Sequence, residues 1–366
     1  MTPVGAQIDP TDHQDISTEN AMSEKLTMQA LVHAGCAGPD GLQLAQVPRP
    51  EARGEDVLVR IAAAGLNRHE LFVIDAHTDN EPKIVGADAV GTIVATGDTA
   101  EQRIGDIVLI NPCIGWTRTE DVPEVPTIIG GPIPGTFAEF ITVPGVNVRP
   151  VPSHLSEIEA AALGLAGLTA YRALFTKGRL AAGQHVVITG ATGGAGTLAV
   201  SMAAAVGAHV TVVTRHSSKA AQASALGASH VVVGIDGFDE KLHTPADLVI
   251  DSVGASAFPA AVKALRPGGR VISFGATTAP DISLSLRELF FRQITLEGTS
   301  MGSAPEFDQM LRFVTENEIR PTVHAVRPLS EAADALREMA SGVAFGKTVF
   351  TLGGVITRES PVAEAR

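Results

Sequence analysis

The sequence contains a glycine-rich turn between an apolar strand pattern and a helical pattern. Residues 185–196 read H-V-V-I-T-G-A-T-G-G-A-G, and the spacing Ala191-x-Gly193-x-x-Gly196 fits the dinucleotide fingerprint with alanine in its first glycine slot. Gly193 lets the backbone approach a pyrophosphate, and the free amides of a helix N-terminus favour an anion there. The pattern therefore predicts a dinucleotide site rather than a tight turn that binds nothing.

The end of the next strand bears on the choice of dinucleotide. Residues 212–219 read V-V-T-R-H-S-S-K, without the Asp or Glu that accepts from the ribose 2′-hydroxyl of NAD. Arg215 and Lys219 suit a 2′-phosphate, and Thr214 and Ser217 add hydroxyl donors. The segment predicts NADP, and the alternative interpretation is a solvated basic loop at a helix start.

The elements that would position these residues alternate between strands and helices. After a capping box at Ser156-x-x-Glu159, strand patterns recur at 185–189, 209–214, 230–233, 248–251, 270–274 and 295–297. Helical patterns lie between them, at 195–206, at 217–226 and in a segment that ends at 265. This alternation predicts an α/β fold with a doubly wound parallel sheet.

A different pattern precedes this sheet. Short strands are expected at 30–33, 56–63, 89–95, 106–110, 138–143 and 147–151, which suggests an irregular small barrel, with a loop over 116–134. Beyond 298 the patterns predict helices at 306–317 and 331–341 and strands at 324–327 and 347–352, a segment that returns to the barrel. The expected divisions are a disordered tail 1–27, the barrel domain 28–152, the dinucleotide domain 153–300, the return 301–352 and a flexible tail 353–366.

Composition excludes several classes of function. The 27 basic residues against 40 acidic ones give a net charge of −13, which argues against nucleic acid and anionic membranes as partners. No apolar run is long enough to span a membrane, and residues 1–25 lack a signal-peptide pattern, so a cytoplasmic location is expected. Two cysteines, Cys36 and Cys113, cannot form a four-thiolate zinc site.

Further motifs carry a family resemblance. They include A-A-A-G-L-N-R-H-E-L (62–71), V-G-A-D-A-V-G-T-I (85–93), L-R-P-G-G-R-V-I-S-F-G-A-T-T (265–278) and F-G-K-T-V-F (345–350). With these the chain resembles the medium-chain dehydrogenase/reductase superfamily, in its zinc-independent, quinone-oxidoreductase-like branch. The resemblance implies a GroES-like β-barrel catalytic domain, an inserted Rossmann domain, a nicotinamide cofactor in the cleft between them, and a homodimer joined near 294–298.

The departures from the family pattern concern zinc. Zinc-dependent members carry a Cys, then Gly-His-Glu, then a second Cys, and the first two positions match Asn67 and 86–88, where Ala87 stands for the histidine. Residues 163–167 offer no thiol in place of the second Cys, and the cysteine-rich structural-zinc lobe is missing. Without thiolate or imidazole a tetrahedral zinc site cannot form, so no metal is expected.

The resemblance implies the following site residues. Asn67 would donate a hydrogen bond to a substrate oxygen, and the alternative is a turn residue. His69 would transfer a proton, and the alternative is a solvated surface histidine. Asp88 is expected to be a structural hydrogen-bond acceptor. Substrate contacts are expected from Phe72, Trp116 and Met301, of which Phe72 and Trp116 could also be plain core. Cofactor contacts are expected from Thr192, Gly193, Gly194, Ala195, Thr214, Arg215, Ser217, Lys219, Ser252, Val253, Gly275, Ala276, Thr277, Ser300, Met301 and Lys347.

The resulting hypothesis is an NADPH-dependent oxidoreductase that reduces a quinone or an α,β-unsaturated carbonyl, a small-molecule substrate, without zinc. Two alternatives stay open: a metal-free carbonyl/alcohol dehydrogenase, and a non-catalytic NADPH-binding sensor or structural protein. Enoyl-thioester reductases of the superfamily use a tyrosine soon after the Asn motif, and residues 67–86 contain none, which argues against that activity.

Overall fold

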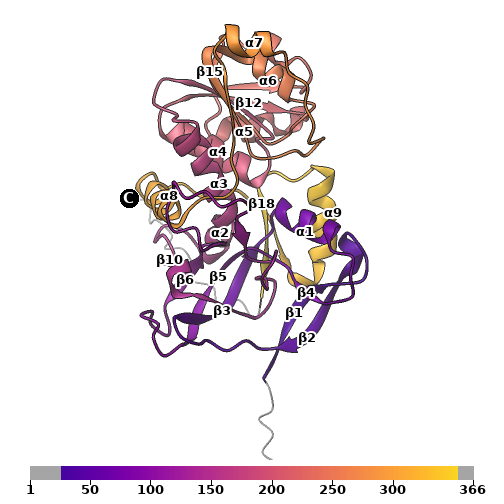
Figure 1. Cartoon of the computed structure of the whole chain (residues 1–366), viewed down its shortest axis with the longest axis vertical. Helices are drawn as coiled ribbons and strands as arrows, with labels where there is room; N and C mark the ends of the chain where they lie inside the picture. The colour runs from indigo at the N-terminus through magenta and orange to yellow at the C-terminus, as the bar shows by residue number, and fades with distance from the viewer. Residues whose placement is uncertain (1–25, 353–366) are drawn as a thin grey trace, which may run out of the picture.

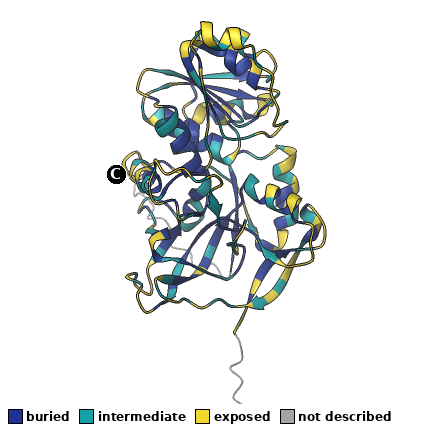
Figure 2. Cartoon of the chain, viewed as in Figure 1, coloured by how far each residue is buried: buried dark blue, intermediate teal, exposed yellow. Residues whose placement is uncertain are grey.

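The computed structural model describes residues 26–352, which form two lobes (Figure 1). One lobe is built on a single parallel sheet, and the other contains the remaining sheets. The expectations for residues 1–25 and for the tail 353–366 lie outside the described residues. Thr27 already belongs to the first strand. Buried residues concentrate in the strands of the sheets and in the helices where the lobes meet (Figure 2).

The Rossmann lobe holds six parallel strands in the order β13-β12-β11-β14-β15-β16. The chain leaves the central strand toward one edge and then returns to build the other half, so the carboxyl ends of β11 and β14 flank a switch point where ligands bind in such sheets. The strands are β11 (His185–Thr189), β12 (His209–Thr214), β13 (His230–Val233), β14 (Ala246–Asp251), β15 (Leu265–Ser273) and β16 (Thr295–Gly298).

The helices of this lobe follow its strands, as the alternating sequence pattern predicts. They are α4 (Gly194–Ala205), α5 (Ala220–Ala225), α6 (Phe258–Ala264) and α7 (Leu286–Phe291), with short helical turns η4 (Ser217–Lys219) and η5 (Phe238–Lys241). Buried valine and isoleucine side chains of β11, β12 and β14 pack under α4 and α6, because a parallel sheet is covered on both faces.

The GroES-like lobe contains the remaining sheets. Its largest sheet runs β10-β6-β5-β3-β18-β17 with β9 paired to β3, beside a sheet β2-β1-β4 and a small pair β7-β8. The strands before the Rossmann lobe are β1 (Thr27–His33), β2 (Leu42–Pro48), β3 (Asp56–Gly65), β4 (Lys83–Ile84), β5 (Asp88–Thr96), β6 (Ile107–Ile110), β7 (Cys113–Ile114), β8 (Thr127–Ile128), β9 (Phe140–Pro144) and β10 (Val148–Pro150).

Two strands of the last part of the chain complete this sheet. β18 (Lys347–Thr351) pairs antiparallel with β3 and parallel with β17 (Val323–Pro328), so residues beyond 300 return to the first lobe. The remaining helices of the described chain are α1 (Arg68–Ala76), α2 (Glu157–Ala161), α3 (Gly164–Tyr171), α8 (Ala304–Glu316) and α9 (Ala332–Ser341), with the π-helical turn η3 (Arg172–Lys177) and the turns η1 (Pro39–Gly41), η2 (Gly145–Asn147) and η6 (Leu329–Glu331).

The structure contains four strands that the sequence did not predict: β2, β4, β7 and β8. β2 was not expected: its residues are mostly partly or fully exposed, and the strand exists because it pairs antiparallel with β1 along seven residues. The expected loop 116–134 contains β8, a two-residue strand that pairs with β7. The capping box at Ser156 is confirmed, since Oε2 of Glu159 accepts from the Ser156 amide at 2.8 Å. None of the described helices combines the length and apolarity needed to cross a bilayer.

Candidate active site

A cavity of about 380 Å³ lies where the two lobes meet. Its wall on the Rossmann side consists of the glycine-rich turn and the carboxyl ends of β12, β14 and β15. The opposite wall comes from the start of α1, the start of β18 and the turn after α9. The cavity thus opens at the switch point of the parallel sheet, the usual position of a dinucleotide in such folds.

The glycine-rich turn forms one wall with four predicted residues, Thr192 to Ala195. A Cβ atom on Gly196 would lie 2.4 Å from the Gly190 carbonyl oxygen, so only glycine permits this close packing of α4 on the turn. The first turn of α4 begins without a side-chain cap and lines the cavity, which makes it suited to a phosphate group.

Two guanidinium groups face the same cavity without an acidic partner. Arg68, at the start of α1, and Arg215, after β12, both line it, and among the ion pairs of residues 26–352 neither arginine takes part. Burial and the nearby charge of Arg215 lower the pKa of Arg68. The Arg215 guanidinium lies against the turn after α9, where a Cβ on Gly342 would be 2.6 Å from its Nη2. This pair of cations is suited to an anionic ligand.

Lys219 lies beside the cavity, and its Nζ is 3.4 Å from Oγ1 of Thr192 in the glycine-rich turn. Its Nζ donates to the carbonyl oxygens of Gly342 at 2.7 Å and Ala344 at 2.8 Å, and the side chain is buried outside the cavity wall. Burial lowers the pKa of this ammonium, and the charge of Arg215 adds to the effect. Lys219 therefore ties the Rossmann lobe to the C-terminal end of α9, where a cation is favoured. Ser217 also lies outside the wall, so the cofactor roles of these two residues stay predictions.

A buried polar cluster stands at the centre of the site. The Nδ2 of Asn67 donates to Oδ2 of Asp88 at 3.0 Å, and Nζ of Lys347 donates to the same oxygen at 3.0 Å. Lys347 also donates to Oδ1 of Asn67, and Oδ1 of Asp88 accepts from the Leu165 amide at 2.6 Å. The two charged neighbours orient the Asn67 amide, because the reverse orientation would set its oxygen against a carboxylate and its NH₂ against an ammonium.

His69 and Glu70, in the first turn of α1, also have side-chain atoms buried from water. Oε2 of Glu70 accepts from the Asn67 amide at 2.5 Å, whereas its Oε1 has no hydrogen-bond partner in the described part of the chain. Burial raises the pKa of Glu70 to about 8, against the opposing charge of Lys347. His69 lines the cavity with its Nε2 buried and unpartnered among residues 26–352, and burial lowers its pKa. The imidazole is therefore neutral at pH 7 and is not a solvated surface group.

We expect Glu70→Gln to change how stability depends on pH. In the folded protein the carboxyl has a pKa near 8 instead of the ordinary 4.5, so wild-type stability falls as the pH rises from about 4.5 to 8 and then levels off. Glutamine does not ionise, so the variant does not lose this stability as the pH rises. The free energy of unfolding of the variant relative to wild type should therefore increase by about 4 kcal/mol from pH 5 to pH 9. Urea unfolding at both pH values measures this difference, with the exposed Glu240→Gln as control. The prediction is contradicted if the free energy of unfolding changes with pH equally in Glu70→Gln and in wild type.

The residues at the family's zinc positions do not fit the metal. Ala87 offers only a methyl group, and Asn67 is hydrogen-bonded to both Asp88 and the Lys347 ammonium. Across residues 26–352 no group of three His, Cys, Asp or Glu side chains is arranged to hold a metal ion. Cys113 is buried, and burial raises the pKa of its thiol to about 11. The local cation at this site is an ammonium, and its counter-ion is Asp88.

The predicted substrate contacts fall into two groups. Phe72, with 58% of its surface exposed, lies at the rim, and the buried Met301 forms part of the inner wall. Trp116 is buried behind the wall and does not line the cavity, so the structure gives no support to its predicted substrate contact. The remaining predicted cofactor residues all line the cavity: Thr214, Ser252, Val253, Gly275, Ala276, Thr277, Ser300 and Lys347.

Sequence reasoning missed several wall residues. His216 follows Arg215 directly, so its place beside a predicted cofactor residue could have indicated that it lines the cavity. Met339, Gly342 and Ala344 come from the end of α9 and the turn after it, and no local pattern links this region to the glycine-rich turn 150 residues earlier. They reach the site because the amide of Gly346 donates to the Thr192 carbonyl at 2.9 Å.

Comparison with known proteins agrees with this architecture. Residues 53–153 match the alcohol dehydrogenase GroES-like domain, and residues 194–316 match the zinc-binding dehydrogenase family. The zinc-type alcohol dehydrogenase-like protein YogA of Leptosphaeria maculans is 31% identical over 341 residues, which cover 85% of this chain and 94% of that protein.

Two solved structures share the whole fold. One is an NAD-dependent alcohol dehydrogenase with 32% identity and a TM-score of 0.84, matched over 89% of this chain and 100% of its own. The other is the quinone oxidoreductase from Coxiella burnetii, with 26% identity, a TM-score of 0.75 and the same coverage.

The fold and the cavity at its switch point define a nucleotide-dependent oxidoreductase with a GroES-like and a Rossmann domain. The chain belongs to the medium-chain dehydrogenase/reductase superfamily, within the zinc-binding alcohol dehydrogenase family. Its relatives are named as alcohol dehydrogenases and as a quinone oxidoreductase.

Proposed function

We propose that this protein is an NADPH-dependent reductase of quinones or α,β-unsaturated carbonyl compounds that works without zinc. The observation that carries the proposal is the buried cluster of Asn67, Asp88 and Lys347, in which Asn67 stands at the position of the first zinc ligand of zinc-dependent relatives. This cluster supplies hydrogen-bond donors and one ammonium charge instead of a metal ion.

The chemistry follows from these donors. When bound, the nicotinamide supplies the hydride, and negative charge develops on the substrate oxygen. The Lys347 ammonium uses two of its three protons on Asn67 and Asp88, and the third is free for that oxygen. The second proton on Nδ2 of Asn67 makes only a long contact of 3.4 Å to the Gly65 carbonyl and can turn to the substrate. Such donors suit a delocalised enolate or hydroquinone anion better than a localised alkoxide.

Proton supply would come from His69 or from water. The His69 imidazole is neutral and lines the cavity, so in one tautomer its N–H can donate to the reduced substrate. Glu70 lies outside the cavity wall and holds the Asn67 amide, so its role is to fix the start of α1.

The preference for NADP rests on the uncompensated guanidinium groups. Arg215 lines the cavity after β12, where NAD-selective sites carry an acidic residue, and Arg68 adds a second charge. The name of one solved relative refers to NAD, and that name describes that protein. The cytoplasmic location stays a prediction from the sequence.

One experiment tests the reaction class and the absence of zinc together. NADPH oxidation is followed with quinones, enones, aldehydes and ketones, before and after dialysis against a chelator, with elemental analysis of the protein. We expect turnover of quinones or enones that survives chelation. Oxidation of simple alcohols without quinone or enone reduction would favour the alternative dehydrogenase. NADPH binding without turnover would favour the non-catalytic alternative. About one tightly held zinc per chain would contradict zinc independence.

We also propose a homodimer joined through the edge of the Rossmann sheet. β16 is one of the two edge strands of the Rossmann sheet, and the preceding helix α7 exposes Leu286 at 72%, Phe290 at 58% and Phe291 at 75%. An unpaired edge strand beside exposed apolar side chains favours pairing with a second copy. Light scattering after size-exclusion chromatography should give twice the chain mass, and a monomer at micromolar concentration would refute the dimer.

A further inference from the structure

One wall of the cavity is a short segment of irregular backbone. Residues 299–303 connect β16 to α8, and two of them, Ser300 and Met301, line the cavity. Met301 has φ 55°, in the left-handed region that favours glycine. A side-chain-bearing residue keeps this conformation only when its surroundings hold it there, so the contacts at both ends of the segment matter.

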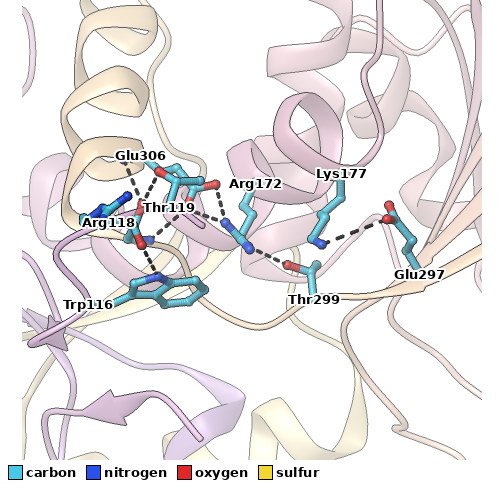
Figure 3. Close-up of polar contacts among 9 residues, drawn as sticks. Trp116, Arg118, Thr119, Arg172, Lys177, Glu297, Thr299 and Glu306 are labelled. Atoms are coloured by element: carbon cyan, nitrogen blue, oxygen red, sulfur yellow. Dashed lines mark hydrogen bonds and ion pairs between the residues drawn. The ribbon is translucent and has the colours of Figure 1, made fainter. Parts of the chain in front are cut away.

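Arg172 holds the first end of this segment. It is the first residue of the π-helical turn η3, it is almost fully buried, and it lies outside the cavity wall. Its Nε donates to Oγ1 of Thr299 at 3.1 Å, as Figure 3 shows. The amide of Thr299 in turn donates to the Ser273 carbonyl at 2.9 Å, which continues the sheet.

The same guanidinium holds the second end through Glu306. Nη1 of Arg172 lies 2.5 Å from both carboxylate oxygens of Glu306, and Oε2 of Glu306 accepts from the amide and from the hydroxyl of Ser303, each at 2.8 Å. Burial by itself would raise the pKa of Glu306, but hydrogen bonds from Ser303, Thr176 and Arg172 hold it below the usual value. Glu306 is therefore a carboxylate, and Arg172 reaches both ends of the segment.

Trp116, in the loop after β7, contacts the same guanidinium. The Arg172 guanidinium lies 4.6 Å from the centroid of the Trp116 ring, a cation–π contact. The Trp116 carbonyl accepts from the Ala304 amide at 2.9 Å, and the hydroxyls of Thr119 and Ser303 are 2.9 Å apart. The loop after β7 is thus fixed to the start of α8 (Figure 3), which explains why Trp116 is buried instead of lining the cavity.

We propose that Arg172, acting with Glu306, is a positioning residue that fixes the 299–303 wall and thereby the place where nicotinamide and substrate meet. This proposal rests on the proposed reductase function. Without the Arg172 guanidinium, residues 299–303 lose the contacts that hold their backbone. The groups suited to phosphates, on α4 and after β12, stay in place. Cofactor affinity should therefore change little, and the rate of transfer should fall.

The test uses three variants of the full chain. Arg172→Lys keeps the charge but cannot contact Thr299 and Glu306 with a planar fork. Thr299→Val removes one hydrogen bond and leaves the buried ion pair intact. Lys177→Met is the matched control, because it removes the neighbouring 4.0 Å pair with Glu297, which does not touch the segment (Figure 3).

The first measurement needs no cofactor. Hydrogen exchange of a peptide that covers residues 299–304 should be faster in Arg172→Lys and Thr299→Val than in wild type, and unchanged in Lys177→Met. If Arg172→Lys does not fold, Thr299→Val still carries this test. Exchange equal to wild type in both variants would overturn the proposal whether or not the protein is a reductase.

The second measurement separates positioning from stability. With NADPH and the best substrate, kcat of Arg172→Lys should fall by about 10- to 100-fold, as expected for a displaced reaction geometry, at nearly unchanged NADPH affinity. Transfer from NADPH deuterated on one face of the nicotinamide should also become less stereospecific. Loss of kcat and NADPH binding in equal proportion would show a merely structural role and overturn the proposal. A wild-type protein that does not oxidise NADPH would instead overturn the proposed function.

Discussion

Asn67→Ala should lower kcat/KM for quinone or enone reduction by about 10²- to 10³-fold, the range for removal of one oxyanion donor. The substitution removes Nδ2 as a donor, and it also removes one of the two acceptors that hold the Lys347 ammonium. The cation then keeps only Asp88 as its partner and is no longer fixed at the position from which it would stabilise the substrate oxygen.

NADPH affinity should change little in this variant, because the glycine-rich turn and Arg215 lie on the opposite wall of the cavity and the Arg68 guanidinium is kept. Steady-state kinetics and fluorescence titration with NADPH separate the two quantities. Asn317→Ala is the matched control, since this asparagine is an exposed residue at the C-terminal end of α8, outside the cavity. An Asn67→Ala protein with full quinone activity would remove Asn67 from the mechanism.

Arg215→Ala should reduce the preference for NADPH over NADH by about 10- to 100-fold, equivalent to roughly 1.5–3 kcal/mol for hydrogen bonds to a charged group. The guanidinium lines the cavity without an acidic partner among the described residues, so its donors are free for a phosphate. NADH binding should be nearly unaffected, because NADH lacks the 2′-phosphate.

Dissociation constants for both cofactors, measured at low and at high salt, check this prediction. Arg103→Ala, an exposed substitution away from the cavity, is the control. An unchanged ratio in Arg215→Ala would contradict the assignment of this residue. Lys219→Met makes a useful comparison, because this side chain contacts the turn after α9; its loss should weaken both cofactors alike.

The sequence was sufficient to predict the fold class and the dinucleotide turn. The strands β11 and β12 have the predicted bounds, because runs of buried valine and isoleucine with flanking turns identify strands of a covered parallel sheet locally. The glycine-rich turn is equally local, since Gly196 is required by a clash with a carbonyl only six residues away. Most predicted cavity residues follow from these two facts, because the carboxyl ends of parallel strands meet at one edge of the sheet.

Only the tertiary structure decided how the charged side chains are partnered. Asn67 and Lys347 are 280 positions apart, and Arg172 and Glu306 are 134 apart, so no periodicity in the sequence links them. Lys219 has the sequence context of a phosphate ligand, yet it donates to carbonyls at the end of α9, since the two lobes pack there. A buried charge takes whichever partner the packing of distant segments brings within hydrogen-bond distance, because leaving it unpaired in a low-dielectric interior costs more than any local preference.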